Sequence, residues 1–118
     1  MSQLVLSLLA KNLTATLAFY ERLGFRVAGG DCESGWLEVC RDGAVLQFYD
    51  QAPIGTLPAP IMSGTIYVYV DDVERVASEL DKDIPFEWGP ETMEYGNREF
   101  AVRDPNGYLI AFSSPTNR

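Results

Sequence analysis

The chain has 118 residues, of which 47% are hydrophobic and 22% are charged, with no low-complexity tract. This length allows one domain with a real core, but not two halves that are stable independently. The formal net charge is −8, from 17 acidic residues against 9 basic ones. This balance excludes nucleic acid as an expected partner, because phosphate binding needs clustered Lys and Arg. The acidity fits a cationic ligand, or it serves only solubility.

The sequence predicts a cytoplasmic protein with no membrane contact. No apolar run reaches the roughly 18 to 20 residues of a membrane span, and residues 1–10 lack the basic start and cleavage pattern of a signal peptide. Cys32 and Cys40 form no CxxC pair, and the chain has no histidine to complete a thiolate metal site or a Cys-His pair. We interpret both cysteines as small packing residues in a reducing compartment.

The first half of the chain predicts a strand, a helix and three further strands. The apolar run at residues 4–10 has the length of a strand, and residues 12–25 then switch to helical spacing. Asn12 is the expected N-cap of this helix and Gly24 its expected C-terminal stop. Three strand-length segments follow, at residues 25–29, 35–41 and 44–50. The turn sequence RDG separates the last two and predicts a hairpin.

The same order repeats in the second half, after a connection at residues 51–63 that contains three prolines. Residues 64–70 predict a strand, and residues 71–82 a helix that begins at Asp71 or Asp72. Three further strands are expected at residues 85–88, 98–104 and 108–114. Because RDPNG stands where RDG stands in the first half, the two halves align as copies of one βαβββ unit.

These two modules define an α+β fold. We place them at about residues 1–52 and 62–114, joined by a linker at about residues 53–61, within a single domain over residues 1–118. Each module is too small to bury its own sheet face alone. We therefore expect the two modules to share one core.

Strand alternation gives each predicted sheet one aliphatic face, which should pack under the helices, and one mixed face. The mixed face combines aromatic, polar and acidic side chains, the composition of a ligand cleft. An oligomer interface is also rich in Tyr and Trp, so both interpretations stay open. Phe86, Trp88 and Tyr95 are expected near the rim of this face. Glu38 and Glu99 are expected to be solvated or salt-bridged. The residues predicted to bind a ligand are Trp36, Glu38, Gln47, Tyr49, Tyr67, Tyr69, Trp88, Glu99 and Ala111.

The tandem βαβββ pattern carries two recognisable segments, NLTATLAFYERLGF after the first strand and REFAVRDPNGYLIAF near the end. With them, nearly the whole chain resembles the glyoxalase, bleomycin-resistance and extradiol-dioxygenase superfamily, also known as the vicinal-oxygen-chelate fold. The resemblance implies that the two modules wrap a curved mixed sheet into a cup. It also implies that a second subunit of a homodimer commonly completes this cup.

Metal-dependent members of that superfamily carry their ligands at matching strand positions of the two modules. The resemblance places these positions at Val5, Gln47, Thr65 and Ala111. Three of the four side chains are not ordinary metal ligands, and one neutral amide does not hold an ion. A shifted site of Glu38, Gln47 and Glu99 offers too few carboxylates. We therefore expect no metal and no other cofactor, which leaves the metal-activated chemistry of the superfamily without its agent.

The drug-binding members of the superfamily, of the bleomycin-resistance type, match the remaining features. They sequester an antibiotic without altering it, with aromatic surfaces for flat rings and carboxylates for cationic groups. The resemblance thus implies non-catalytic binding of a planar aromatic antibiotic of cationic or peptide type, and no catalytic residue. Two alternatives remain: a metal-independent enzyme that rests on Glu38 or Glu99, and a dimer that serves only as an interaction module.

Overall fold

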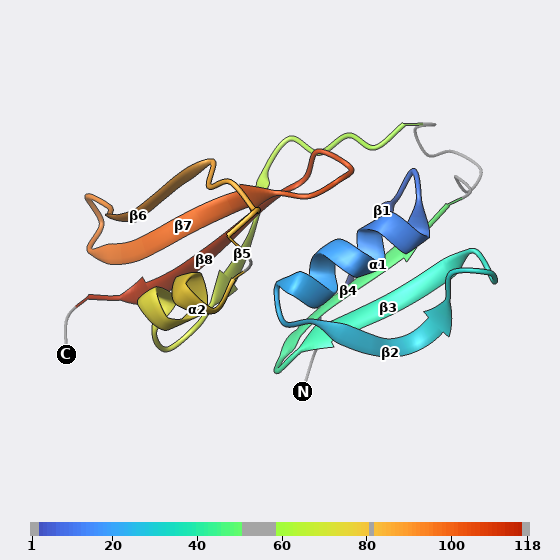
Figure 1. The fold of residues 1–118 in the computed structure, drawn as a ribbon, viewed down its shortest axis with the longest axis horizontal. Helices are drawn as coiled ribbons and strands as arrows, with labels where there is room; N and C mark the ends of the chain where they lie inside the picture. Colours follow the sequence, from blue (N-terminus) through green and yellow to red (C-terminus); the bar gives the residue numbers. More distant parts are fainter. Residues whose placement is uncertain (1–2, 51–58, 81, 117–118) are drawn as a thin grey trace. The chain divides into compact units, whose positions relative to one another are not determined.

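The computed structural model describes residues 3–50, 59–80 and 82–116, and it divides the chain into two compact units, Met1–Ile61 and Met62–Arg118 (Figure 1). Over these described residues, each unit contains one helix and one four-stranded mixed sheet. Residues 53–58 of the expected linker lie outside the described residues. Within the described part of the chain, no helix is long and apolar enough to cross a membrane.

In the first unit, helix α1 packs on one face of a sheet with the strand order β1-β4-β3-β2. The elements are β1 (Leu6–Leu9), α1 (Leu13–Arg22), β2 (Arg26–Asp31), β3 (Trp36–Arg41) and β4 (Ala44–Tyr49). Strands β1 and β4 are parallel, and the other pairs are antiparallel. The side chain of Asn12 caps α1 by accepting from the N–H of Ala15 at 2.9 Å. Gly24 follows the last helical turn at a φ of +89°, a conformation that favours glycine.

The second unit repeats this arrangement with the strand order β5-β8-β7-β6. Its elements are β5 (Thr65–Tyr69), α2 (Val73–Glu79), β6 (Trp88–Thr92), β7 (Asn97–Arg103) and β8 (Leu109–Pro115). Strands β5 and β8 are parallel, as β1 and β4 are in the first unit. Of the two aspartates expected at the start of α2, Asp72 is the N-cap, and its carboxylate accepts from the N–H of Arg75 at 3.3 Å. The predicted α+β class and tandem βαβββ order are confirmed.

Strand β6 differs from its prediction, because it begins at Trp88 rather than at Pro85. A proline has no N–H for a strand ladder, and Phe86 instead packs on Phe100 with ring centroids 4.9 Å apart. The pairing of β6 with β7 then shifts register between Trp88 and Glu91, across a Gly-Pro pair. This interruption removes the alternation on which strand prediction depends.

The helix-facing side of each sheet forms the core of its unit. In the first unit, the fully buried ring of Tyr20 contacts Phe25 and Phe48, with centroid distances of 5.4 and 5.0 Å. In the second, Phe100 and Phe112 stack at 5.3 Å. Because side chains alternate along a strand, the residues between these core positions lie on the other side of each sheet, here named the helix-free face.

Candidate ligand-binding faces

The helix-free face of the first sheet carries the four predicted site residues of this unit. The antiparallel register places Trp36 opposite Tyr49, and Glu38 opposite Gln47. The amide nitrogen of Gln47 donates to Oε1 of Glu38 at 2.8 Å. Trp36 is 45% exposed. This face therefore presents an exposed indole and a tyrosine beside a carboxylate that one neutral donor holds in place.

The helix-free face of the second sheet carries the other five predicted residues. One row across β5, β8, β7 and β6 contains Tyr67, Ala111, Ala101 and Trp88. Tyr69, Ser113 and Glu99 occupy the neighbouring row. The rings of Tyr67 and Tyr69 stack with centroids 6.0 Å apart and an interplanar angle of 18°.

The exposure of these side chains divides them into two kinds. Tyr67 is 42% exposed and Tyr69 is 71% exposed, whereas Ala111 and Glu99 are fully buried. The two tyrosines thus present ring surface to solvent. Ala111 and Glu99 instead form the buried part of this face.

Glu99 lies at the centre of a group of aromatic donors. The indole Nε1 of Trp88 donates to its Oε2 at 3.0 Å, and the hydroxyl of Tyr67 donates to the same oxygen at 3.4 Å. The hydroxyl of Tyr95 donates to Oε1 through a short hydrogen bond. We name Tyr67, Trp88, Tyr95 and Glu99 together the Glu99 cluster.

The expectation that Glu99 is solvated or salt-bridged is wrong. Its side chain is fully buried, and among the residues that the structure describes no lysine or arginine forms an ion pair with it. Three neutral donors take the place of water, which is what allows a carboxyl group to be buried without a cation. Glu38, by contrast, is half-buried and accepts from an amide.

Tyr95 belongs to this cluster, although sequence alternation places it only near the rim. Its hydrogen bond to Glu99 raises the pKa of the Tyr95 phenol above its ordinary value, with burial and the neighbouring Tyr67 acting in the same direction. The residue lies in the turn between β6 and β7, where the N–H of Met93 donates to Asn97 at 2.8 Å. Its separation of only four positions from Glu99 was the available signal, because it puts the ring within reach of the strand that follows the turn.

Metal-dependent relatives would carry ligands at four positions, of which Gln47 and Ala111 are two. Neither of these two residues lies among side chains that could complete a metal site. Gln47 lies opposite Ser7 and Glu38, and its amide is already bonded to the latter. Ala111 lies between Tyr67 and Ala101. Over the described residues, no group of three His, Cys, Asp or Glu is placed to hold a metal ion. This donor set does not fit a catalytic metal.

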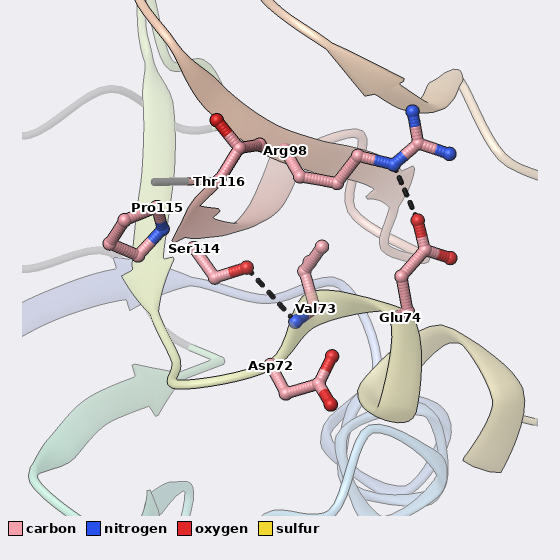
Figure 2. A pocket seen from close by; sticks show the side chains of 7 residues that line it. All are labelled: Asp72, Val73, Glu74, Arg98, Ser114, Pro115 and Thr116. Carbon is pink, nitrogen blue, oxygen red and sulfur yellow. Dashed lines mark hydrogen bonds and ion pairs between the residues drawn. The ribbon is translucent and has the colours of Figure 1, made fainter. Parts of the chain in front are cut away.

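A cavity of about 460 Å³ lies elsewhere in the second unit, beside the start of α2 (Figure 2). Its lining residues are Asp72, Val73, Glu74, Arg98, Ser114, Pro115 and Thr116. Figure 2 shows Arg98 reaching from β7 to pair with Glu74, and the hydroxyl of Ser114 accepting from the N–H of Val73 at 3.1 Å. These contacts fasten α2 to its sheet. None of the predicted site residues lines this cavity.

The repeated βαβββ units, each with an aromatic helix-free face, define a class of small proteins built from paired modules. The family model described as the glyoxalase/bleomycin resistance protein/dioxygenase superfamily matches residues 3–112. The chain belongs to this superfamily. It is similar to a bleomycin resistance protein of Klebsiella pneumoniae, with 27% identity over 109 residues that cover 86% of this chain and 82% of the relative.

Solved structures share the fold over nearly the full length. A bleomycin-binding protein complexed with bleomycin matches with a TM-score of 0.71 at 23% identity, covering 100% of both chains. TnmS3, an antibiotic binding protein from Streptomyces sp. CB03234, matches with a TM-score of 0.76 at 20% identity, covering 98% of this chain and 97% of its own. Likenesses at these identities establish the fold.

Proposed function

We propose that the protein binds a planar aromatic antibiotic of cationic or peptide type and sequesters it without changing it chemically. One observation carries the proposal: exposed aromatic rings lie beside carboxylates on the helix-free face of each sheet. The names of the relatives, a bleomycin resistance protein and two antibiotic-binding proteins, support the same class of ligand.

The exposed rings account for the affinity. Stacking against an aromatic ring contributes about 0.5–1.5 kcal/mol beyond the area that it buries, and a cation over an exposed ring contributes about 0.5–1 kcal/mol. Trp36 and Tyr49 supply such surface in the first unit, and Tyr67, Tyr69 and Trp88 in the second. The net charge of −8 draws cationic ligands towards the protein.

Both candidate carboxylates already accept hydrogen bonds from neighbouring side chains, which supports binding without catalysis. A metal-independent enzyme of this fold would use Glu38 or Glu99 as its general base. Glu38 already accepts from Gln47, and Glu99 already accepts from three aromatic donors. The chain also has no histidine to take over proton transfer.

We further propose that the protein is a cytoplasmic homodimer whose partner subunit completes the ligand site. Large aromatic side chains stay exposed on the helix-free faces, among them Trp36 at 45% and the stacked pair of Tyr67 at 42% and Tyr69 at 71%. A small monomer rarely leaves such surface in water. Sedimentation at micromolar concentration should show a dimer, and a species that stays monomeric would contradict this part of the proposal.

The binding proposal can be tested through the fluorescence of Trp36. The chain has two tryptophans, so the variant Trp88→Phe reports on the first unit alone. Titration with bleomycin and other flat aromatic peptide antibiotics should give saturable quenching by at least one of them. By calorimetry, Trp36→Ala should weaken the same ligand by about tenfold, whereas Trp36→Phe, which keeps a ring, should weaken it by less. No saturable response to any ligand would contradict the proposal.

A further inference from the structure

We propose that the Glu99 cluster recognises an onium group, a cation whose charge is covered by methyl or methylene groups and which carries no N–H. This inference rests on the proposed function and specifies the cationic part of its ligand. It assigns that part to the helix-free face of the second unit.

The polar groups of the three aromatic side chains in the cluster all point towards Glu99. The indole N–H of Trp88 and the hydroxyls of Tyr67 and Tyr95 all donate to Glu99. Their hydrogen-bonding edges are therefore turned inwards and occupied. Tyr67 and Tyr95 are 42% and 61% exposed. Because their hydroxyls are turned towards Glu99, we infer that they present mainly ring carbon to solvent.

The carboxyl group of Glu99 places a negative charge next to these rings. The indole N–H of Trp88 can only donate, and the two tyrosine hydroxyls also donate to the carboxyl group of Glu99. Three donors around one carboxyl group match the ionised carboxylate, because that form only accepts hydrogen bonds. The charge of Glu99 is buried and has no cationic partner among the described residues. A buried charge acts on its surroundings through a lower effective dielectric than an exposed one does. Its hydrogen bonds also polarise the phenols and the indole, so the rings become better partners for a cation.

Ammonium and guanidinium groups match this cluster poorly. Each of their N–H groups needs an acceptor, and the cost of leaving one unpaired counts against binding. Both oxygens of Glu99 already accept hydrogen bonds, and the side chain is fully buried. An onium ion has no N–H to satisfy, and aromatic rings are its usual partners in proteins.

Three small probes separate these chemistries. Choline carries the onium group, 3,3-dimethylbutan-1-ol is its uncharged isostere, and ethanolamine carries an ammonium group with N–H donors. The reporter is the NMR signal of the Trp88 indole N–H, assigned by its persistence in Trp36→Phe. At constant ionic strength, choline should shift this signal saturably. The other two should bind at least about fivefold more weakly, the effect expected for a cation over aromatic rings.

Variants of the cluster separate its charge from its rings. Glu99→Gln removes the charge and should weaken choline by about tenfold. Tyr95→Leu removes a ring and should weaken it by about fivefold, whereas Tyr95→Phe keeps the ring and loses only the hydrogen bond, so it should weaken choline by less. Glu91→Gln is the matched control, because Glu91 pairs with Glu99 in the sheet register but is exposed. It should change choline binding by less than about twofold.

Two results would overturn the inference in a folded protein. One is an unchanged Trp88 signal at saturating choline, and the other is equal binding of choline and its uncharged isostere. The tyrosine variants keep the test valid if Glu99→Gln proves unstable. Failure here is distinct from failure of the proposed function, which is read from Trp36: an aromatic antibiotic that quenches Trp36 while choline leaves Trp88 unchanged would refute only the onium site.

Discussion

The indole Nε1 of Trp88 lies 3.0 Å from Oε2 of Glu99, so a side chain of β6 is fastened to a fully buried carboxyl group of β7. Tyr67 of β5 and Tyr95 of the turn between β6 and β7 reach the same group. One acidic side chain thus ties together two strands and a turn around its own strand. It fixes the position of three aromatic rings on the helix-free face.

Replacing Glu99 should therefore destabilise the fold. Glu99→Gln places an amide N–H₂ among three donors, and losing hydrogen bonds to a charged group costs about 1.5–3 kcal/mol. Urea unfolding should show a decrease of this size in the free energy of unfolding. The control Glu91→Gln, at an exposed position of the neighbouring strand, should stay within about 0.5 kcal/mol of wild type. Equal effects of the two substitutions would contradict the role assigned to Glu99.

Tyr95 should lose its proton at higher pH than an ordinary tyrosine. Its hydrogen bond to Glu99 raises the pKa of the phenol above the usual value of 10.0. The unfolded chain releases this proton first, so the contribution to stability is complete below about pH 10 and is lost as pH rises through the pKa of the folded state. The difference between the tyrosinate absorbance curves of wild type and Tyr95→Phe isolates this group. A difference curve with an ordinary midpoint would contradict the hydrogen bond, and Glu99→Gln should lower the midpoint.

Gly89 should tolerate no side chain. A Cβ built there would lie 2.2 Å from the backbone oxygen of Glu99, and the residue has a φ of +75°. Gly89→Ala should therefore lower the free energy of unfolding by about 2–4 kcal/mol and displace the indole of Trp88. At Gly43 nothing lies within 4 Å of such a Cβ, so Gly43→Ala should change stability by less than about 1 kcal/mol. Similar losses for both variants would show that the close approach at Gly89 is unimportant.

The order of elements was predictable because periodicity and capping are local signals. Asn12 and Asp72 precede helices whose apolar residues repeat at the helical period, and both are the observed N-caps. The start of β6 was not predictable by the same means. Its Gly-Pro pair breaks the alternation, and only the pairing with β7 defines the strand.

The helix-free faces were also predictable, since strand alternation alone assigns a residue to a side. The Glu99 cluster was only partly predictable. Trp88 and Tyr67 lie 11 and 32 positions away from Glu99 in the sequence, and no local pattern shows that they converge on it. Strand alternation places Glu99 on the mixed face but does not show which side chains contact it. Since acidic residues are mostly exposed, contact with water was the expectation for Glu99.

The central claim is that the ligand leaves the protein unaltered, and incubation with a tenfold molar excess of ligand tests it most directly. The ligand would be whichever antibiotic quenches Trp36, and the bound and free fractions would be separated and analysed by mass spectrometry. Sequestration predicts that the bound amount stops at the number of sites and that all recovered ligand keeps its mass. An enzyme would instead convert the excess ligand to a product of different mass, and the amount of product would grow with time beyond the number of sites. That result would contradict the claim.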